Sequence, residues 1–347
     1  MNRVRLALNI CTYKREQILR KNLEVLKGSE FFNPRNKHYY NKLEIFVIDN
    51  ASELTLDPFS NLHFFHNPNT GGSGGFQRGI EEIRKYDIFT HVVFMDDDIS
   101  FEMSAFYILY DYLENVDIKN ADRPVAGRML DKDNPNIQWT AAEKWNAGEI
   151  QHVEFLRDIT DPSNPYIPGK VIYDEDAEYG GFWFCCYPYS FVKDNDIFPF
   201  FLHCDDVEYG LRCGKSPVNI EGVHVWHETW EKKMSPVIEY YDRRNSRLLN
   251  RMLGNYPDLR TELIDIKEEI DIAHMKGETV KEFLLIKAFI DSFKSKEWFE
   301  EKGNGNYHQK LVSLFRNREG TEKMVLSVIN RVYRRWMVVA LSIKNYY

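Results

Sequence analysis

The sequence predicts an α/β fold, with a mostly parallel sheet flanked by helices and a helical extension at the C-terminal end. Over the first hundred residues, short apolar runs alternate with segments of helical apolar spacing, which is the pattern of βαβ units. After Pro236 the strand-length runs give way to long helical patterns. We therefore expect a sheet-based domain over residues 1–235 and a helical region over residues 236–347.

Each expected element follows from its local pattern. Runs rich in β-branched and aromatic residues predict strands over 4–10, 43–48, 62–65, 88–95, 123–130, 179–187 and 223–230. Residues 137–140 and 142–145 are predicted to form a hairpin. Helical spacing predicts helices over 16–27, 76–86, 101–116, 246–253, 257–274, 279–294 and 321–345.

Composition narrows the class of protein. The chain of 347 residues is 43% hydrophobic, enough for a sizeable core, and its net charge of −8 argues against a nucleic-acid binder. Its five cysteines include no Cys-x-x-Cys pair, so we expect a reducing compartment with neither a disulfide framework nor a structural zinc site. No uncharged apolar stretch approaches 18 residues and the first apolar run is too short for a signal peptide, which favours a cytoplasmic protein.

Three successive carboxylates, Asp96, Asp97 and Asp98, follow the fourth predicted strand. Open α/β sheets bind ligands at the carboxyl ends of their strands. Unpaired adjacent carboxylates are costly to bury, and a divalent cation removes that cost. Alternation along an extended chain sends Asp96 and Asp98 to one side and Asp97 to the other. The sequence thus predicts a metal site at Asp96 and Asp98, with a solvated acidic turn as the alternative.

A third metal ligand is expected from a late strand that carries His224 and His227. Residues three apart on a strand cannot face the same way, so one of the two is the candidate, against a purely structural histidine. Mixed carboxylate and imidazole ligands suit Mn²⁺, whereas Mg²⁺ prefers oxygen.

A glycine-rich stretch over residues 67–75 precedes the second predicted helix. Four glycines in five residues let a backbone approach a ligand closely, and the free N–H groups of a following helix suit a phosphate. Arg78 would add positive charge. The stretch matches neither the dinucleotide fingerprint nor the Walker A loop, and a flexible linker is the alternative.

Three later features each have two interpretations. Asp205 and Asp206 begin a short predicted helix, where they serve either as helix-capping acids or as a general base near a substrate hydroxyl. Trp183 either stacks on a sugar face or belongs to the core. Residues 321–345 carry basic and aromatic residues beside an apolar face, which suits an anionic membrane surface or, alternatively, packing on the domain or in a dimer.

In their order along the chain, these motifs resemble those of family 2 glycosyltransferases of the GT-A fold. The likeness covers about residues 4–245 and rests on residues 9–15, 47–52, 67–79, 96–98, 205–212 and 225–227. Within the family it points to bacterial galactofuranosyltransferases and rhamnosyltransferase-like enzymes. The galactan-polymerising members carry a β-sandwich domain before the catalytic one, whereas this chain starts at the first strand, so polymerisation is not carried over.

The resemblance implies a metal-dependent, inverting transfer of a sugar from a nucleotide-sugar donor, with UDP-galactofuranose favoured. The acceptor would be a glycan or a lipid-linked sugar in cell-surface polysaccharide synthesis. The implied nucleotide and donor residues are Thr12, Arg15, Asp49, Asn69, Gly72, Arg78 and Asp97. Asp96, Asp98 and His227 would hold Mn²⁺ or Mg²⁺, and Asp206 would be the catalytic base. The implied acceptor residues are Trp183, His203, Asp205 and Glu228.

Other functions stay open at this point. A rhamnosyltransferase using dTDP-rhamnose is one alternative, because residues 12–15 and Asp49 suggest uridine or thymidine without separating them. A sugar nucleotidyltransferase would need a basic triphosphate-binding loop near the N-terminus, where only Lys14 and Arg15 qualify. A non-catalytic scaffold is the third alternative. Peripheral attachment at the inner face of the cell membrane through residues 321–345 is left open beside packing on the domain or in a dimer. No nucleic-acid partner is expected, and a homo-oligomer is left open.

Overall fold

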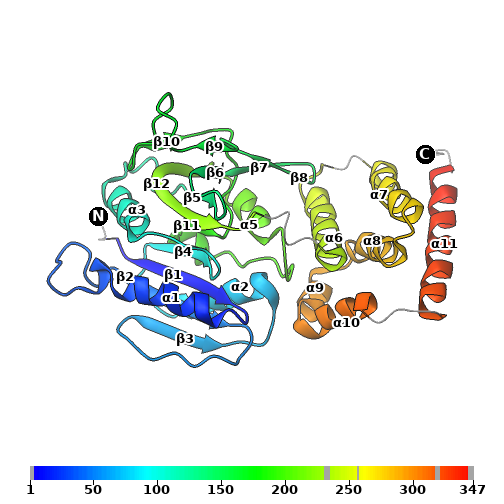
Figure 1. Ribbon diagram of the computed structural model, residues 1–347, viewed down its shortest axis with the longest axis horizontal. Coiled ribbons are helices and arrows are strands. Elements are labelled where there is room, and N and C mark those ends of the chain that lie inside the picture. The colour runs from blue at the N-terminus through cyan, green and yellow to red at the C-terminus, as the bar shows by residue number, and fades with distance from the viewer. Residues whose placement is uncertain (1–3, 230–234, 256–257, 317–320, 343–347) are drawn as a thin grey trace. The chain divides into compact units, whose positions relative to one another are not determined.

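The computed structural model describes residues 4–229, 235–255, 258–316 and 321–342. It divides into two compact units, one of Met1–Phe198 and Asp205–Lys232 and one of Pro199–Cys204 and Lys233–Tyr347. The first unit holds the sheet and the second is built of helices (Figure 1). The predicted fold class is confirmed, while the assignment of functional domains to residues 1–235 and 236–347 stays a prediction.

The sheet of the first unit has the strand order β10-β12-β5-β11-β4-β1-β2-β3. Its strands are β1 Leu6–Thr12, β2 Leu43–Asp49, β3 Leu62–His66, β4 His91–Asp96, β5 Val125–Asp131, β10 Val171–Tyr173, β11 Phe184–Pro188 and β12 Val218–His227. Neighbours from β4 to β3 are parallel, as are β5 and β12. β11 runs antiparallel between β4 and β5, and β10 runs antiparallel at the edge.

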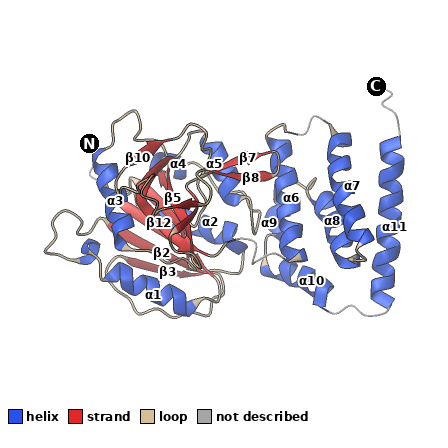
Figure 2. Ribbon diagram, turned by 45° about the horizontal axis from the view of Figure 1, so that its top comes forward, coloured by secondary structure: helices blue, strands red, loops and turns tan. Residues whose placement is uncertain are grey.

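Helices cover both faces of this sheet (Figure 2). α1 (Glu16–Lys27) and α3 (Met103–Asn115) bury Leu19 and Phe106 against one face, together with Leu8 of β1. α2 (Gly71–Ile83), α4 (Tyr189–Val192) and α5 (Asp205–Cys213) pack on the other face, where Ile80 meets Phe94. This layering explains why the central strands are apolar on both sides.

The strand register brings polar residues to one edge. Thr12 of β1 pairs with Asp49 of β2, and Cys11 pairs with Asp96 of β4. Three parallel neighbours thus end side by side, and the residues at their carboxyl ends lie along the same edge of the sheet.

The glycine-rich stretch differs from its predicted form, because its glycines form the start of α2 at Gly71 instead of a loop before residue 76. A Cβ on Gly75 would overlap Cys11 Sγ, and one on Gly79 would overlap the side chain of Asn9. Asn9 Nδ2 in turn donates to the carbonyl of Phe76 at 2.9 Å. The glycines at 75 and 79 therefore let α2 lie directly against β1, which is a packing role.

The hairpin predicted from residues 137–140 and 142–145 is wrong. β6 (Ile137–Thr140) pairs with β5 and with β9 (Arg157–Asp158), whereas β7 (Glu143–Asn146) pairs with β8 (Glu149–His152). The predicted hairpin left a single residue for its turn, and a β-hairpin needs at least two.

The second unit is helical. Its elements are α6 Pro236–Met252, α7 Leu259–Met275, α8 Thr279–Asp291, α9 Lys296–Lys302, α10 Gly305–Arg316 and α11 Thr321–Ser342. α8 packs against α6, α7 and α11, and its Leu285 and Phe289 share a core with Ile266 of α7 and Met337 of α11. Among the residues described, no helix is both long and apolar enough to cross a membrane.

Three predicted ends fall outside the described residues. These are residue 230 of the strand predicted over 223–230, residue 257 of the helix predicted over 257–274 and residues 343–345 of the last predicted helix. α6 begins at Pro236, ten residues before its predicted start, and its first turn is capped by Ser235 Oγ, which accepts the Ile238 N–H at 3.3 Å.

Candidate active site at the carboxyl ends of the strands

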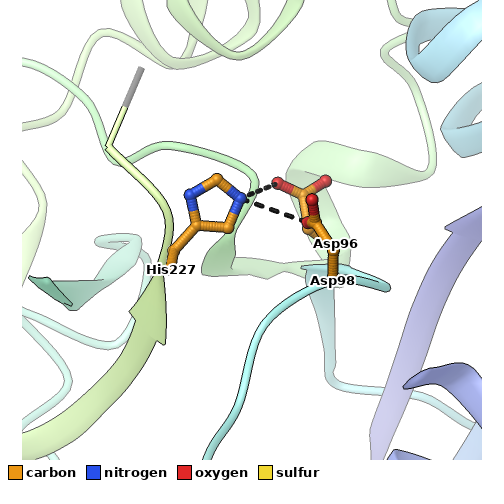
Figure 3. A group of neighbouring side chains, drawn as sticks. All are labelled: Asp96, Asp98 and His227. Carbon is orange, nitrogen blue, oxygen red and sulfur yellow. Dashed lines mark hydrogen bonds and ion pairs between the residues drawn. The ribbon is translucent and has the colours of Figure 1, made fainter. Parts of the chain in front are cut away.

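Three predicted metal ligands lie together. Asp96 ends β4, Asp98 follows two residues later and His227 ends β12. Each offers one ligand atom, and these atoms lie within 4.8 Å of one another. His227 Nε2 lies 3.2 Å from Asp98 Oδ1 and 4.0 Å from Asp96 Oδ2, and the imidazole points at both carboxylates (Figure 3). Two carboxylates and one imidazole form a donor set that suits a divalent transition metal such as Mn²⁺.

A backbone bridge explains how His227 reaches the acids. The Ser100 N–H donates to the Trp226 carbonyl at 2.9 Å, and the Trp226 N–H donates to the Ser100 carbonyl at 2.8 Å. Because the bridge is antiparallel, the residue after Trp226 lies beside the residues before Ser100. This contact fixes the end of β12 next to the three aspartates.

His224, the other candidate ligand, has a different environment. Its Nδ1 lies 2.9 Å from the hydroxyl of Tyr166. Burial lowers the pKa of His224 to about 4, so the ring is neutral at pH 7. The sequence left the choice between the two histidines open, and the geometry selects His227.

Asp97 lies in the turn after β4, so strand alternation does not apply to it, and its partners come from β1 and the loop that follows β1. Its carboxylate is 2% exposed and accepts from Thr12 Oγ1 at 2.6 Å and from Arg15 Nη1 at 2.8 Å. Arg15 Nη2 lies 3.1 Å from Asp98 Oδ2, so one guanidinium links the two acids. Burial raises the pKa of Asp97, while Arg15 and Thr12 act to lower it. The predicted contact of Asp97 with the donor stays a prediction.

Asp49 organises the loop after β2. Its fully buried carboxylate accepts the backbone N–H groups of Ala51, Glu53 and Leu54, each at 2.9 Å. His66 Nδ1 lies 3.3 Å from Asp49 Oδ2. The Asp49 side chain therefore holds the backbone of the loop that follows β2.

The three predicted donor residues around α2 make contacts of their own. Asn69 Oδ1 accepts the Gly71 N–H at 3.1 Å, and Arg78 pairs with Glu82 on the same helix at 2.6 Å. A Cβ on Gly72 would lie 3.8 Å from Asp205 Oδ2, so the first turn of α2 lies near the start of α5.

Asp206 lies in the first turn of α5, where its Oδ1 accepts the N–H of Val207 at 2.8 Å. Burial raises the pKa of Asp206 well above its ordinary value, and the charges of Asp205 and Glu143 raise it further. Glu143 Oε1 lies 3.0 Å from His152 Nδ1. The sequence reasoning missed Glu143, which sits in no motif and joins this acidic group only through the fold.

The predicted acceptor residues are distributed over both units. Trp183 Nε1 donates to the Gly127 carbonyl at 2.8 Å, and the half-buried ring packs on the core. Glu228 follows His227 directly and is partly exposed. His203 belongs to the second unit, where its Nδ1 lies 3.6 Å from Asp242 Oδ1.

Residues 8–167, which hold most of β1, all of β2 and β4 and the three aspartates, match the family model for glycosyl transferase family 2. This part of the chain is a family 2 glycosyltransferase domain. The match bears out the predicted family for this part of the chain.

The glycosyltransferase domain has curated relatives in mycobacteria. The chain is 30% identical over 191 residues to the galactofuranosyltransferase GlfT2 of Mycolicibacterium smegmatis. The aligned region covers 50% of this chain and 28% of that protein. It is 28% identical over 220 residues to GlfT2 of Mycobacterium tuberculosis, and this alignment covers 57% of this chain and 33% of that protein. The chain thus spans about a third of the length of these relatives.

Among solved structures, the fold resembles that of GalNAc-T7 in its crystal structure with UDP, GalNAc and Mn²⁺. The TM-score is 0.50 at 12% identity, with 87% of this chain and 56% of that chain covered. At this identity the likeness concerns the fold, which is that of the GT-A glycosyltransferases.

Proposed function

We propose that this protein is a metal-dependent, inverting glycosyltransferase that transfers galactofuranose from UDP-galactofuranose to a glycan or lipid-linked acceptor. The observation that carries the proposal is the cluster of Asp96, Asp98 and His227 at the edge where parallel strands end. The choice of donor is supported by the mycobacterial relatives, which are named as galactofuranosyltransferases.

Asp96, Asp98 and His227 would hold the divalent ion, Mn²⁺ or Mg²⁺, and their donor set fits it. When bound, such an ion supplies Lewis-acid stabilisation of the negative charge on the leaving diphosphate. Arg15 and His227 contact different oxygens of Asp98. The Arg15 guanidinium pairs with Oδ2, and the His227 imidazole lies near Oδ1. The chain thereby orients the carboxylate before any ligand binds.

Asp206 would act as general base. It takes the proton of the acceptor hydroxyl as that oxygen attacks the anomeric carbon, while the bond from this carbon to the diphosphate breaks. The configuration inverts in one displacement, so no nucleophilic side chain is needed. A raised pKa suits this role, because a carboxylate of higher pKa is a stronger proton acceptor.

The donor and acceptor sides complete the proposal. The nucleotide would be flanked by Thr12, Arg15 and Asp49. The diphosphate and the donor sugar would be flanked by Asn69, Gly72, Arg78 and Asp97. Trp183, Asp205 and Glu228 of the first unit would serve the acceptor, and the acceptor role of His203 stays a prediction. The placement of Thr12, Asp49 and Asp96 at three adjacent strand ends supports the nucleotide side.

Donor turnover tests this function. Purified protein is incubated with UDP-galactofuranose or dTDP-rhamnose, with Mn²⁺ or with EDTA, and release of the nucleoside diphosphate is measured. We expect Mn²⁺-dependent UDP release. Preferential release of dTDP would assign a rhamnosyltransferase, and pyrophosphate release from UTP and a sugar 1-phosphate would assign a nucleotidyltransferase.

Asp206→Asn tests the base separately. We expect turnover to fall by about 10²- to 10⁴-fold, the usual contribution of a general base. Binding of UDP with Mn²⁺, followed by thermal shift, should be retained. Unchanged turnover in Asp206→Asn would reject the base assignment and leave the donor assignment standing.

A further inference from the structure

The last helix, α11 (Thr321–Ser342), presents an exposed apolar surface. Seven large apolar side chains of α11 are at least half exposed, more than on any other helix in the described ranges: Met324, Val325, Val328, Val332, Trp336, Val338 and Val339. Val332 is 61% exposed and Trp336 51%. Apolar side chains gathered this densely on one helix are unusual on a protein surface facing water alone.

The opposite side of α11 is fastened to its own unit. Leu326 and Met337 are buried, and Met337 packs among residues of α7 and α8. Asn330 Nδ2 donates to the Thr279 carbonyl at 3.0 Å, and Arg334 Nε pairs with Glu282 at 2.8 Å. The exposed apolar surface is therefore the outward side of a docked helix.

Basic residues lie within this outward surface. Val328, Val332, Arg335 and Val339 follow one another at steps of three and four residues, so all four share one side of the helix. Arg331 and Arg335 are both exposed. With four basic residues and one acid, α11 carries a net charge of +3 in a chain of net charge −8.

This charge pattern decides between a second copy of the chain and a lipid surface. In a parallel pairing of two α11 helices, Arg331 and Arg335 would each lie beside their own counterparts inside an apolar contact, which buries like charges together. At an anionic bilayer the arginine stems lie along the apolar boundary and the guanidinium groups reach the lipid phosphates.

We propose that the outward side of α11 binds the surface of an anionic membrane, with Val328, Val332 and Trp336 at the acyl boundary and Arg331 and Arg335 on the lipid phosphates. This inference goes beyond the proposed reaction, because it holds for any donor sugar. It assigns the surface of a bilayer as the partner of the helical unit.

Vesicle sedimentation tests the inference with the full chain. The protein is mixed with vesicles of phosphatidylcholine alone or of phosphatidylcholine with phosphatidylglycerol. We expect binding to the phosphatidylglycerol vesicles about tenfold tighter than to the neutral ones, and weaker in high salt. Val332→Asp should abolish binding, and Arg335→Glu should reduce it to the level of neutral vesicles.

Matched controls guard against unfolding. Ile118→Asp places the same charge at a side chain that is 85% exposed outside α11 and should bind as the wild type does. Trp336→Ser removes apolar surface without adding charge and should also weaken binding. Circular dichroism melts of all variants should match that of the wild type, because each changed side chain is exposed.

Two results would overturn the inference. One is equal sedimentation of the wild type and Val332→Asp. The other is a wild-type dimer in analytical ultracentrifugation that Val332→Asp dissociates while neither protein binds vesicles, which would assign the surface to a second copy. Since no sugar donor takes part, failure here leaves the proposed reaction untouched.

Discussion

At the residue scale, Asp97 is the buried link between the first and fourth strands. The sequence predicted from strand alternation that Asp97 would face away from Asp96 and Asp98, but β4 ends at Asp96 and residues 97–98 form a turn. The partners of Asp97, Thr12 and Arg15, lie more than eighty residues earlier in the chain. No local pattern predicts such a pair, because it depends on β1 lying beside β4.

Thr12→Val tests the importance of this link. Valine fills the same volume but leaves one oxygen of a buried carboxylate without its 2.6 Å donor. Hydrogen bonds to charged groups contribute about 1.5–3 kcal/mol, and we expect a loss of that size in the free energy of unfolding, measured in urea. Thr12→Ser keeps the hydroxyl and should retain most of the stability. Equal losses in the two variants would contradict the assigned hydrogen bond.

His227 shows the same limit of sequence reasoning. The spacing to His224 established that only one histidine faces the acids but did not say which. The bridge between Ser100 and Trp226 resolves the choice, since it joins segments 126 residues apart. Residue types thus predicted the chemistry of the candidate site, and long-range pairing determined its members.

At the element scale, α1 and α2 show where local pattern suffices and where it does not. The bounds predicted for α1 coincide with the structure, because its apolar spacing is strong and glycine ends it. For α2 the glycines indicated a loop, since isolated glycines disfavour helices. Packing of the helix against β1 outweighs the low helix propensity of glycine. The sequence of α2 alone does not show that Cys11 and Asn9 leave no room for larger side chains at positions 75 and 79.

Gly75→Ala and Gly79→Ala test the packing role. Each added methyl group would overlap a side chain of β1, so we expect both variants to be destabilised by about 1–3 kcal/mol, as for overpacked cores. Cys11→Ala combined with Gly75→Ala should recover part of the loss, because it removes the sulfur nearest the new methyl group. Urea unfolding of the wild type, Gly75→Ala, Cys11→Ala and the double variant measures the coupling between the two positions.

Gly28→Ala is the matched control for these substitutions. Gly28 ends α1 in the right-handed region at φ −75°, and its new Cβ would come no closer than 3.4 Å to the Glu24 carbonyl. We expect a change in unfolding free energy near zero. A loss at Gly28 as large as at Gly75 would show that alanine is disfavoured at these glycines for reasons other than contact with β1.

At the scale of the whole molecule, the sheet order combines predictable and unpredictable parts. The parallel strands β1, β2 and β4 follow from βαβ alternation. The position of β11, antiparallel between β4 and β5, does not follow from the sequence, because these neighbours come from distant segments of the chain. An apolar run of this kind also does not tell whether a strand lies at the edge or in the centre of a sheet. The helical spacing of apolar residues predicted that the second unit is helical. It did not predict α9 and α10 as separate helices.

Stability of the whole molecule should fall in mild acid through His91. Burial lowers the pKa of His91 to about 4, below the 6.5 expected in the unfolded chain. The unfolded state therefore binds more protons between these values, and stability decreases as the pH falls below 6.5. Linkage gives a loss of about 2 kcal/mol between pH 7 and pH 5 from this histidine.

His91→Gln isolates that contribution. Glutamine does not titrate, so urea midpoints of the variant should change less between pH 7 and pH 5 than those of the wild type. The comparison is made by tryptophan fluorescence at both pH values. Identical pH dependence in the two proteins would show that His91 is not held neutral by burial.

Binding of Mn²⁺ tests the central claim most directly. Isothermal titration of the metal-free protein, without nucleotide, measures whether Asp96, Asp98 and His227 form one divalent-ion site. We expect one Mn²⁺ per chain in the wild type, affinity lowered at least about tenfold in His227→Ala and in Asp98→Asn, and unchanged binding in the control His224→Gln. Mn²⁺ binding of equal affinity in the wild type and in His227→Ala and Asp98→Asn would contradict the assignment of this cluster as the metal site.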